Sequence, residues 1–162
     1  MKRRHALRIL SGSLFAAFAL IMHRNHVEAA NMDLKPWRLT EEEWRQRLTT
    51  DQYHILREQG TEPPFSSPLL YEHRPGVYAC AGCGLALFDA SAKFESGTGW
   101  PSFYAPIDGR IETKLDFRLV LPRKEYHCIR CGGHQGHVFD DGPEPTGQRW
   151  CNNGLALRFI PR

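Results

Sequence analysis

The cysteines of this chain divide by their spacing into a set of four and a single one. Cys80 and Cys83 form one Cys-x-x-Cys motif, Cys128 and Cys131 form a second, and a glycine follows each. Two intervening residues let both sulfurs turn toward one point, and glycine adopts the unusual backbone angles of such a turn. Four thiolates at about 2.3 Å complete the tetrahedral shell of Zn²⁺ and leave no open position. The pattern therefore predicts a structural zinc site with four cysteine ligands, which ties two distant β-hairpins together.

Other chemistry is compatible with these two motifs. Iron would accept the same four sulfurs. In an oxidising compartment the four cysteines could instead form two disulfides. A Cys-x-x-Cys motif also serves as a redox pair. The glycine after each motif favours the metal site.

Cys151 is the cysteine left over, in the segment Gln-Arg-Trp-Cys-Asn-Asn at 148–153. An isolated cysteine is most often a small buried apolar residue. Arg149, two residues earlier, shares a face with Cys151 on an extended segment, and a nearby cation favours the thiolate. Only about a few per cent of an ordinary thiol is ionised at neutral pH, so such assistance matters for a nucleophile. Cys151 is therefore a candidate catalytic thiol.

Two histidines, His134 and His137, follow the second Cys-x-x-Cys motif among glycines. Four cysteines already fill a zinc shell, so these histidines are not needed as ligands. They are either structural residues or part of a site that a ligand approaches closely, which glycines permit. The glycine-rich loop at 96–103 adds an aromatic wall, Trp100, but lacks the lysine of a phosphate-binding loop.

Short elements must position these residues. Thr40 and Glu43 form a capping box that begins a helix, and a second short helix at 53–57 ends before Gly60. Beyond residue 62, glycine and proline separate short apolar runs at 76–79, 85–88, 117–121, 138–139 and 156–160, which are typical of strands. The sequence predicts a mainly β domain behind short N-terminal helices.

The first 29 residues have the pattern of an export signal. A basic start with Arg3 and Arg4 precedes an apolar stretch at 9–22, which is shorter than the roughly 20 residues that span a bilayer. The arginine pair resembles a twin-arginine signal, so we expect a periplasmic protein. An ordinary secretory signal or an uncleaved anchor is the alternative, and only an uncleaved anchor would hold the protein at a membrane. A linker at 30–36 would lead into the domain at 37–162.

The positive charge of the chain resides in this N-terminal segment. The whole chain has 21 basic and 18 acidic side chains, of which residues 1–29 contain five and one. The rest therefore has 16 basic and 17 acidic side chains, a net charge of −1. This balance argues against a nucleic-acid partner.

Several segments together resemble the B-type methionine sulfoxide reductases, which act on the R epimer. The similar segments are residues 60–65, 76–80, 96–103, 131–143 and 149–153. They occur in the order of the family and extend over roughly residues 37–161. The resemblance implies two antiparallel sheets with short N-terminal helices, and it assigns the four cysteines of the two motifs to structural zinc.

The resemblance also implies the roles of the site residues. Cys151 would be the nucleophile, while His134 and His137 would bind and protonate the sulfoxide oxygen. The remaining pocket residues would be Trp100, Phe139, Arg149 and Asn153. The substrate would be methionine-R-sulfoxide in oxidised proteins or peptides, and the protein is expected to be a monomer that repairs oxidative damage.

Two positions depart from the family pattern. Trp150 replaces the usual tyrosine, and Thr98 stands where many relatives have a resolving cysteine. Cys151 sulfenic acid would then be reduced by an external thiol, from thioredoxin or another reductant. The competing hypotheses are a zinc-ribbon-like binding module without catalysis and a redox-exchange protein that uses its Cys-x-x-Cys pairs.

Overall fold

Two antiparallel sheets and two short helices make up the domain in the computed structural model, which describes residues 34–117 and 122–162. Residues 36–162 form one compact unit. The expected export signal at 1–29 and most of the linker at 30–36 lie outside the described residues. Within the described ranges, no helix is long and apolar enough to cross a membrane.

The two helices begin with the same local device. Helix α2 (Glu41–Arg47) starts at Thr40 with the capping box that the sequence predicts, in which Glu43 hydrogen-bonds back to Thr40. Helix α3 (Thr50–Glu58) has its own capping box between Thr49 and Gln52, so it starts earlier than the expected 53–57. Each box satisfies backbone N–H groups that a helix start would otherwise leave unpaired.

The smaller sheet has three strands in the order β2-β1-β9. They are β1 (Gly76–Cys80), β2 (Ala86–Asp89) and β9 (Leu157–Pro161). The larger sheet has six strands in the order β3-β4-β8-β7-β6-β5. They are β3 (Lys93–Phe94), β4 (Ser102–Phe103), β5 (Ile111–Asp116), β6 (Arg123–Cys128), β7 (His134–Phe139) and β8 (Arg149–Asn152).

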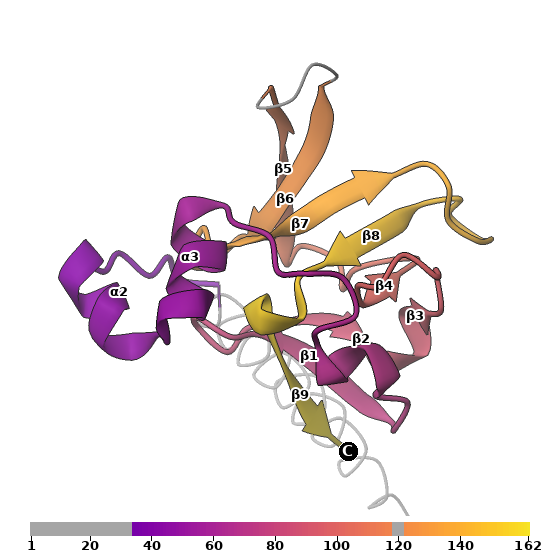
Figure 1. Cartoon of the computed structure of the whole chain (residues 1–162), viewed down its shortest axis with the longest axis horizontal. Coiled ribbons are helices and arrows are strands. Elements are labelled where there is room, and N and C mark those ends of the chain that lie inside the picture. Colours follow the sequence, from indigo (N-terminus) through magenta and orange to yellow (C-terminus); the bar gives the residue numbers. More distant parts are fainter. Residues whose placement is uncertain (1–33, 118–121) are drawn as a thin grey trace, which may run out of the picture. The chain divides into compact units, whose positions relative to one another are not determined.

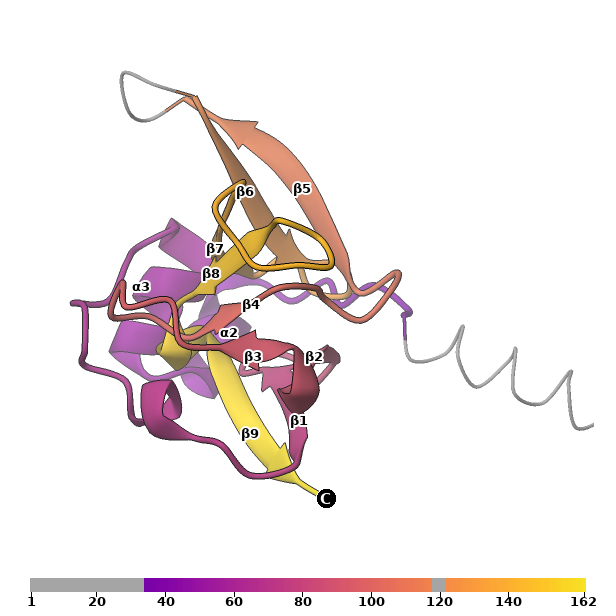
Figure 2. The ribbon, with the colours of Figure 1, turned by 90° about the vertical axis from the view of Figure 1, so that its right-hand side faces the viewer.

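Three one-turn 3₁₀ helices join these strands to the rest of the domain. They are η1 (Pro68–Tyr71), η2 (Ala90–Ala92) and η3 (Gly154–Ala156). The long hairpin of β5 and β6 projects away from the other strands (Figures 1 and 2). The two antiparallel sheets confirm the predicted fold class.

The strand expected at 117–121 falls almost entirely outside the described residues. Strand β5 ends at Asp116, Phe117 follows it outside any strand, and residues 118–121 lie outside the described part of the chain. Strands β5 and β6 have few apolar residues, so hydrophobic runs did not reveal them. Their pairing over six residue pairs compensates for the small apolar area that they bury.

Aromatic side chains join the two sheets. Phe88 on β2 stacks on Phe103 of β4 with ring centroids 4.2 Å apart, and Tyr78 on β1 meets Phe103 edge to face. On the same side of the larger sheet, Tyr126 packs against Trp150. All but Trp150 are fully buried, so this face of the larger sheet belongs to the core. The opposite face of the larger sheet is therefore the one that can carry a functional site.

Candidate functional site

The four cysteines of the two motifs meet at one point between the sheets. The first motif closes the β1–β2 hairpin and the second closes the β6–β7 hairpin. We call this group the four-cysteine cluster. Both turns use the glycine after the motif: Gly84 has φ 79° and Gly132 has φ 66°. In each turn that glycine donates its N–H to the carbonyl of the first cysteine at 2.8 Å.

The sulfur positions of the four-cysteine cluster fit a tetrahedral metal ion. The four sulfurs lie within 4.8 Å of one another, with Cys80 Sγ 3.7 Å from Cys131 Sγ and Cys83 Sγ 3.5 Å from Cys128 Sγ. Four ligands at about 2.3 Å from a central ion would be separated by about 3.8 Å. All four cysteines are free and buried, so the alternative of two disulfides does not describe this structure.

The N-terminal helices hold the four-cysteine cluster from outside. Arg47 on α2 donates to the carbonyl of Gly82, and Arg57 on α3 donates to the carbonyl of Cys131. Gln135 donates an N–H to Cys80 Sγ at 3.5 Å. Because four thiolates around a divalent ion carry a net charge of −2, nearby arginines and N–H donors stabilise the charged form.

Cys151 lies in the middle of the larger sheet, on the face away from the core. The register of the strands places one residue from each of five neighbouring strands in a row across this face. In order from β4 to β5, the row is Ser102, Cys151, His137, Glu125 and Lys114. Cys151 and His137 are direct cross-strand neighbours, so the thiol and the imidazole share one site.

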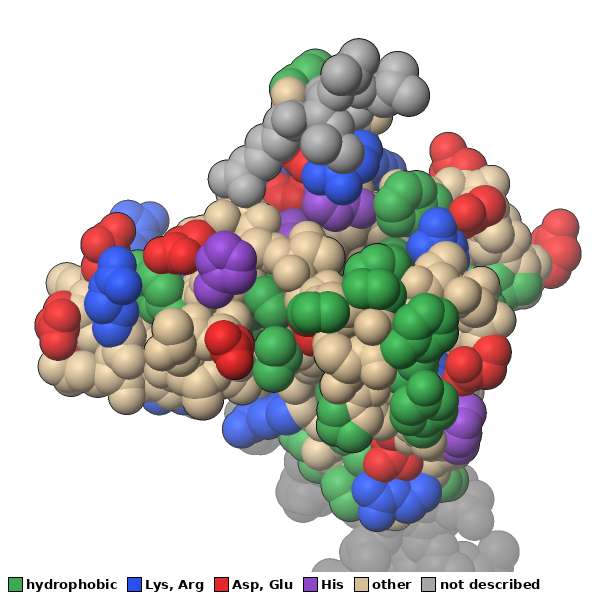
Figure 3. All heavy atoms as spheres, in the orientation of Figure 1, with side chains coloured by type: hydrophobic (Ala, Val, Ile, Leu, Met, Phe, Trp, Pro, Cys, Tyr) green, Lys and Arg blue, Asp and Glu red, His purple; other side chains and the backbone are tan. Residues whose placement is uncertain are grey.

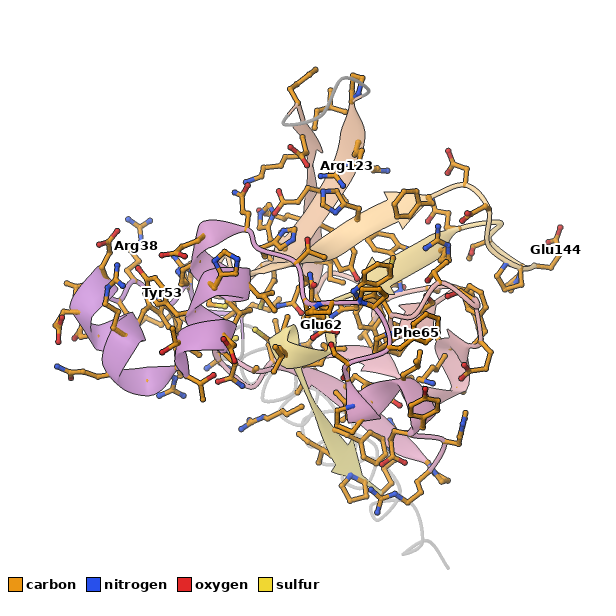
Figure 4. The ribbon with its side chains drawn as sticks, viewed as in Figure 1. Arg38, Tyr53, Glu62, Phe65, Arg123 and Glu144 are labelled. Carbon is orange, nitrogen blue, oxygen red and sulfur yellow. The ribbon has the colours of Figure 1, made fainter. Side chains whose placement is uncertain are left out.

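His137 is held by a carboxylate that the sequence analysis did not identify. His137 Nε2 lies 2.9 Å from Asp116 Oδ2, and Arg123 Nη2 lies 2.7 Å from the same oxygen. Figure 4 shows Arg123 at the hairpin of β5 and β6, above β7. Burial lowers the pKa of His137, and the nearby positive charge of Arg123 adds to this, although the hydrogen bond to Asp116 opposes it. The free histidine is therefore neutral at neutral pH.

His134 joins His137 because the pairing of β6 and β7 is irregular. Two strand residues three apart face opposite sides of a regular sheet. The register shifts between Tyr126 and His127, and this bulge brings the rings of His134 and His137 to within 5.5 Å. His134 Nδ1 pairs with Glu125 Oε1 at 2.7 Å, and both side chains are 2% exposed.

Glu125 is the second carboxylate that the sequence analysis did not identify. Its other oxygen, Oε2, forms an ion pair with Lys114 at 3.1 Å. Burial raises the pKa of Glu125, but the interactions with His134 and Lys114 outweigh burial and leave the pKa below its ordinary value. Each histidine therefore has its own carboxylate, and each carboxylate has its own cation.

A cavity of about 120 Å³ opens above Cys151. We call it the Cys151 cavity. Its lining residues are Thr61, Trp100, Arg123, Gly136, His137, Phe139, Cys151, Asn152 and Asn153. Five predicted site residues thus come together here: Trp100, His137, Phe139, Cys151 and Asn153. The other two predicted site residues, His134 and Arg149, do not line the cavity.

Arg149 supports the cavity wall through two contacts. Its guanidinium lies over the ring of Phe139, 4.3 Å from the centroid. Two of its nitrogens pair with the two carboxylate oxygens of Asp141 at 2.8 and 2.9 Å. Asp141 therefore fixes the Arg149 side chain beside Cys151.

Glu62 is a buried residue that the sequence analysis did not select. Its carboxylate accepts the backbone N–H groups of Gly154 and Leu155 at 2.6 and 2.8 Å. Its own backbone N–H donates to Asn153, and its carbonyl accepts from the Trp100 indole. Glu62 thus positions two walls of the Cys151 cavity. No local sequence pattern indicates this role, because the residues that Glu62 contacts are about 40 and 90 positions away along the chain.

The comparisons with known proteins agree with this geometry. Residues 48–161 match the SelR domain model. A peptide methionine sulfoxide reductase MsrB from Methanosarcina barkeri is 54% identical over 121 residues, which cover 74% of this chain and 85% of that protein. The chain belongs to the family of B-type peptide methionine sulfoxide reductases.

Two further relatives are similar to this chain to nearly the same extent. The chloroplastic peptide methionine sulfoxide reductase B1 of Arabidopsis thaliana is 52% identical over 122 residues, 75% of this chain and 60% of that protein. MsrB of Bradyrhizobium diazoefficiens is 48% identical over 124 residues, 76% of this chain and 89% of that protein. The recognised resemblance to the family is confirmed.

Burial and charge shift the pKa of the Cys151 thiol in opposite directions. Burial raises the pKa of Cys151, whereas the Arg149 charge and hydrogen bonds from Thr98 and Arg149 lower it; the net shift is upward. The expected help from Arg149 is present, but desolvation outweighs it. The free enzyme therefore holds Cys151 mainly as the thiol at neutral pH.

We predict that Cys151 titrates above the ordinary pKa of a free cysteine. The rate of alkylation by iodoacetamide, measured against pH, gives this midpoint. Arg149→Leu should move the midpoint further upward because it removes a stabilising cation. Arg45→Leu, which changes an exposed arginine on α2, is the control and should leave the midpoint in place. A wild-type midpoint below that of free cysteine would contradict the balance described here.

Proposed function

We propose that this chain reduces methionine-R-sulfoxide in peptides and oxidised proteins to methionine, with Cys151 as the nucleophile. The observation that carries this proposal is the direct juxtaposition of Cys151 and His137 in a small cavity with Trp100 and Phe139 on its walls. The aromatic side chains suit the apolar S-methyl group, and the thiol and imidazole suit the polar sulfoxide. The preference for the R epimer rests on the family resemblance.

The reaction transfers one oxygen atom to the enzyme. Cys151 thiolate attacks the sulfoxide sulfur while a protonated histidine donates a proton to the oxygen. The hydroxyl then passes from the substrate sulfur to the Cys151 sulfur: a Cys151 sulfur–oxygen bond forms while the substrate sulfur–oxygen bond and the transient sulfur–sulfur bond break. Cys151 becomes sulfenic acid, and the substrate sulfur gains the two electrons that Cys151 loses. We assign the proton donation to His137, because it lines the cavity next to Cys151, whereas His134 lies behind it.

Regeneration requires a thiol from another molecule. Thr98 provides a hydroxyl where many relatives have a resolving cysteine, and the other four cysteines belong to the four-cysteine cluster. An external thiol would condense with the sulfenic acid and release water, and a second thiol would then free Cys151 as a disulfide product leaves. A thioredoxin-like protein or a small dithiol would serve.

The four-cysteine cluster would hold structural zinc. Bound zinc would supply stability and no open coordination position for chemistry, because four sulfurs complete its shell. Hydrogen bonds among the thiols lower the pKa of Cys83 and raise that of Cys128. A central cation would let all four remain thiolates.

The direct test of the proposed function is turnover with separated epimers. Purified protein with dithiothreitol should reduce blocked methionine-R-sulfoxide and leave the S epimer unchanged. Cys151→Ser should lower the rate to background because serine is not ionised at neutral pH. Equal reduction of both epimers, or unchanged turnover by Cys151→Ser, would overturn the proposal and favour a binding module or another redox-active cysteine.

Asp116 should act as a positioning residue for His137. We predict that Asp116→Asn lowers kcat by about 10- to 100-fold, at most the lower end of the roughly 100- to 10,000-fold contribution of general acid–base catalysis, with little change in KM. The lost carboxylate should lower the pKa of His137. The reacting form, Cys151 thiolate with protonated His137, is the minor form of the singly protonated pair, so the lower of the two pKa values, that of His137, sets the acid limb of the pH profile. This limb should therefore move to lower pH. Glu112→Gln removes a carboxylate that pairs with His127 on the same strands and should leave kcat unchanged. An unaltered pH profile for Asp116→Asn would exclude this role.

Metal removal should unfold the domain rather than only stop turnover. We predict one zinc per chain by elemental analysis, and a loss of cooperative thermal unfolding after extraction with a strong chelator. Cys83→Ser should have the same effect, because it removes one ligand. Cys151→Ser is the matched control and should keep the metal and the transition. A metal-free protein with an unchanged melting temperature would contradict the assignment.

A further inference from the structure

A second and larger hollow lies beside the Cys151 cavity. It has a volume of about 540 Å³ and is bounded by helix α3, the segment at 61–69 and the chain around η3. Its lining includes Asp51, His54, Thr61, Glu62, Leu69 and Leu155. In Figure 4 the segment that carries Glu62 and Phe65 runs from the end of α3 across the domain.

The two hollows share a wall. Thr61 lines both of them, and Glu62, the next residue, lines the larger one while its backbone holds Trp100 and Asn153 of the smaller one. A polypeptide bound at Cys151 would enter the larger hollow by crossing the exposed Thr61. This adjacency relates the larger hollow to the proposed catalytic site.

The Cys151 cavity is too small for more than the end of one side chain. Its volume of about 120 Å³ is a little below the roughly 150 Å³ of an apolar cavity that holds one benzene molecule. Methionine sulfoxide has four heavy atoms beyond Cβ, which match this space. The backbone and the neighbouring residues of a peptide substrate must therefore lie outside the cavity.

The walls of the larger hollow are fixed before any ligand arrives. Pro63, Pro64 and Pro68 restrict the backbone of the segment at 61–69. Phe65, which is 60% exposed, has φ 63° and donates its N–H to the carbonyl of Gly99, next to Trp100. A rigid surface loses little entropy on binding, so it is suited to recognise an extended chain.

The chemistry of the larger hollow is apolar with a polar edge. Leu69, Leu155 and Pro68 present apolar surface, and Leu155 is 37% exposed. Asp51 and His54 on α3 form the polar edge. Figure 3 shows hydrophobic side chains gathered across this face of the molecule.

We propose that the larger hollow is a peptide groove that binds the residues flanking the oxidised methionine of a polypeptide substrate. The proposal rests on the proposed function and names the substrate as an extended polypeptide segment with an apolar residue beside the methionine sulfoxide. That apolar side chain packs on Leu69 and Leu155. The groove is then the feature that distinguishes a polypeptide from free methionine sulfoxide.

The test compares substrates that differ only in flanking residues. Blocked methionine-R-sulfoxide is measured against heptapeptides with leucine or with aspartate on either side of the sulfoxide. The leucine peptides should have a kcat/KM about tenfold higher than the blocked amino acid, as expected for one buried leucine side chain. Leu155→Glu should bring the ratio of these two kcat/KM values to about one. Ile160→Glu changes a side chain of similar exposure, 41%, outside the groove and should keep the ratio.

A second measurement does not depend on turnover or on a stable groove variant. The Cys151→Ser protein is photo-cross-linked to a methionine sulfoxide heptapeptide with benzophenone at a flanking position. Adducts at residues 61–69 or Leu155 would support the groove. Adducts confined to other surfaces, a wild-type ratio near one, or burial of Leu155 in a concentration-dependent dimer would overturn it. Failure of every substrate to turn over would instead refute the proposed function.

Discussion

The pairing of β7 with β8 is the interaction on which the arrangement of this domain depends. It sets His137 directly beside Cys151, and it is so close that a Cβ on Gly136 would lie 1.9 Å from the carbonyl oxygen of Cys151. Only glycine permits this approach. The strands on both sides then complete the site: β4 contributes Ser102 beside Cys151, and β6 contributes the carboxylate of Glu125. The four-cysteine cluster ties the end of the β6–β7 hairpin to the smaller sheet.

The charge states of Cys151 and His137 in the free enzyme follow from their burial. Removing groups from water disfavours their charged forms, and this raises the pKa of Cys151 and lowers that of His137. The free enzyme therefore holds a neutral thiol next to a neutral imidazole. The ionised pair that attacks the sulfoxide is a minor form, stabilised by Arg149 on one side and by Asp116 on the other. Buried carboxylates paired with Arg123 and Lys114 keep the histidines in place without leaving an uncompensated charge.

The sequence was sufficient for those features that local chemistry determines. The four-cysteine cluster follows from two Cys-x-x-Cys-Gly motifs, and the start of α2 follows from the capping box at Thr40. Cys151 was separated from the other cysteines by its spacing. Family resemblance added Trp100, Phe139 and Asn153, which do line the Cys151 cavity.

The remaining features depend on register and on distant contacts. The spacing of His134 and His137 places them on opposite faces of a regular strand, and only the bulge in the β6–β7 pairing unites them. Asp116 and Glu125 lie on strands without an apolar pattern, and Glu62 acts on residues far along the chain. The upward shift of the Cys151 pKa depends on burial, which the sequence around Arg149 does not reveal.

The most direct test of the central claim is a single turnover without reductant. Fully reduced protein is mixed with an excess of blocked methionine-R-sulfoxide, and methionine is quantified while the protein is treated with dimedone and mapped by mass spectrometry. The account predicts about one methionine per chain and a dimedone adduct on Cys151, the mark of sulfenic acid. A disulfide between Cys151 and a cysteine of the four-cysteine cluster, or methionine formed without modification of Cys151, would contradict it.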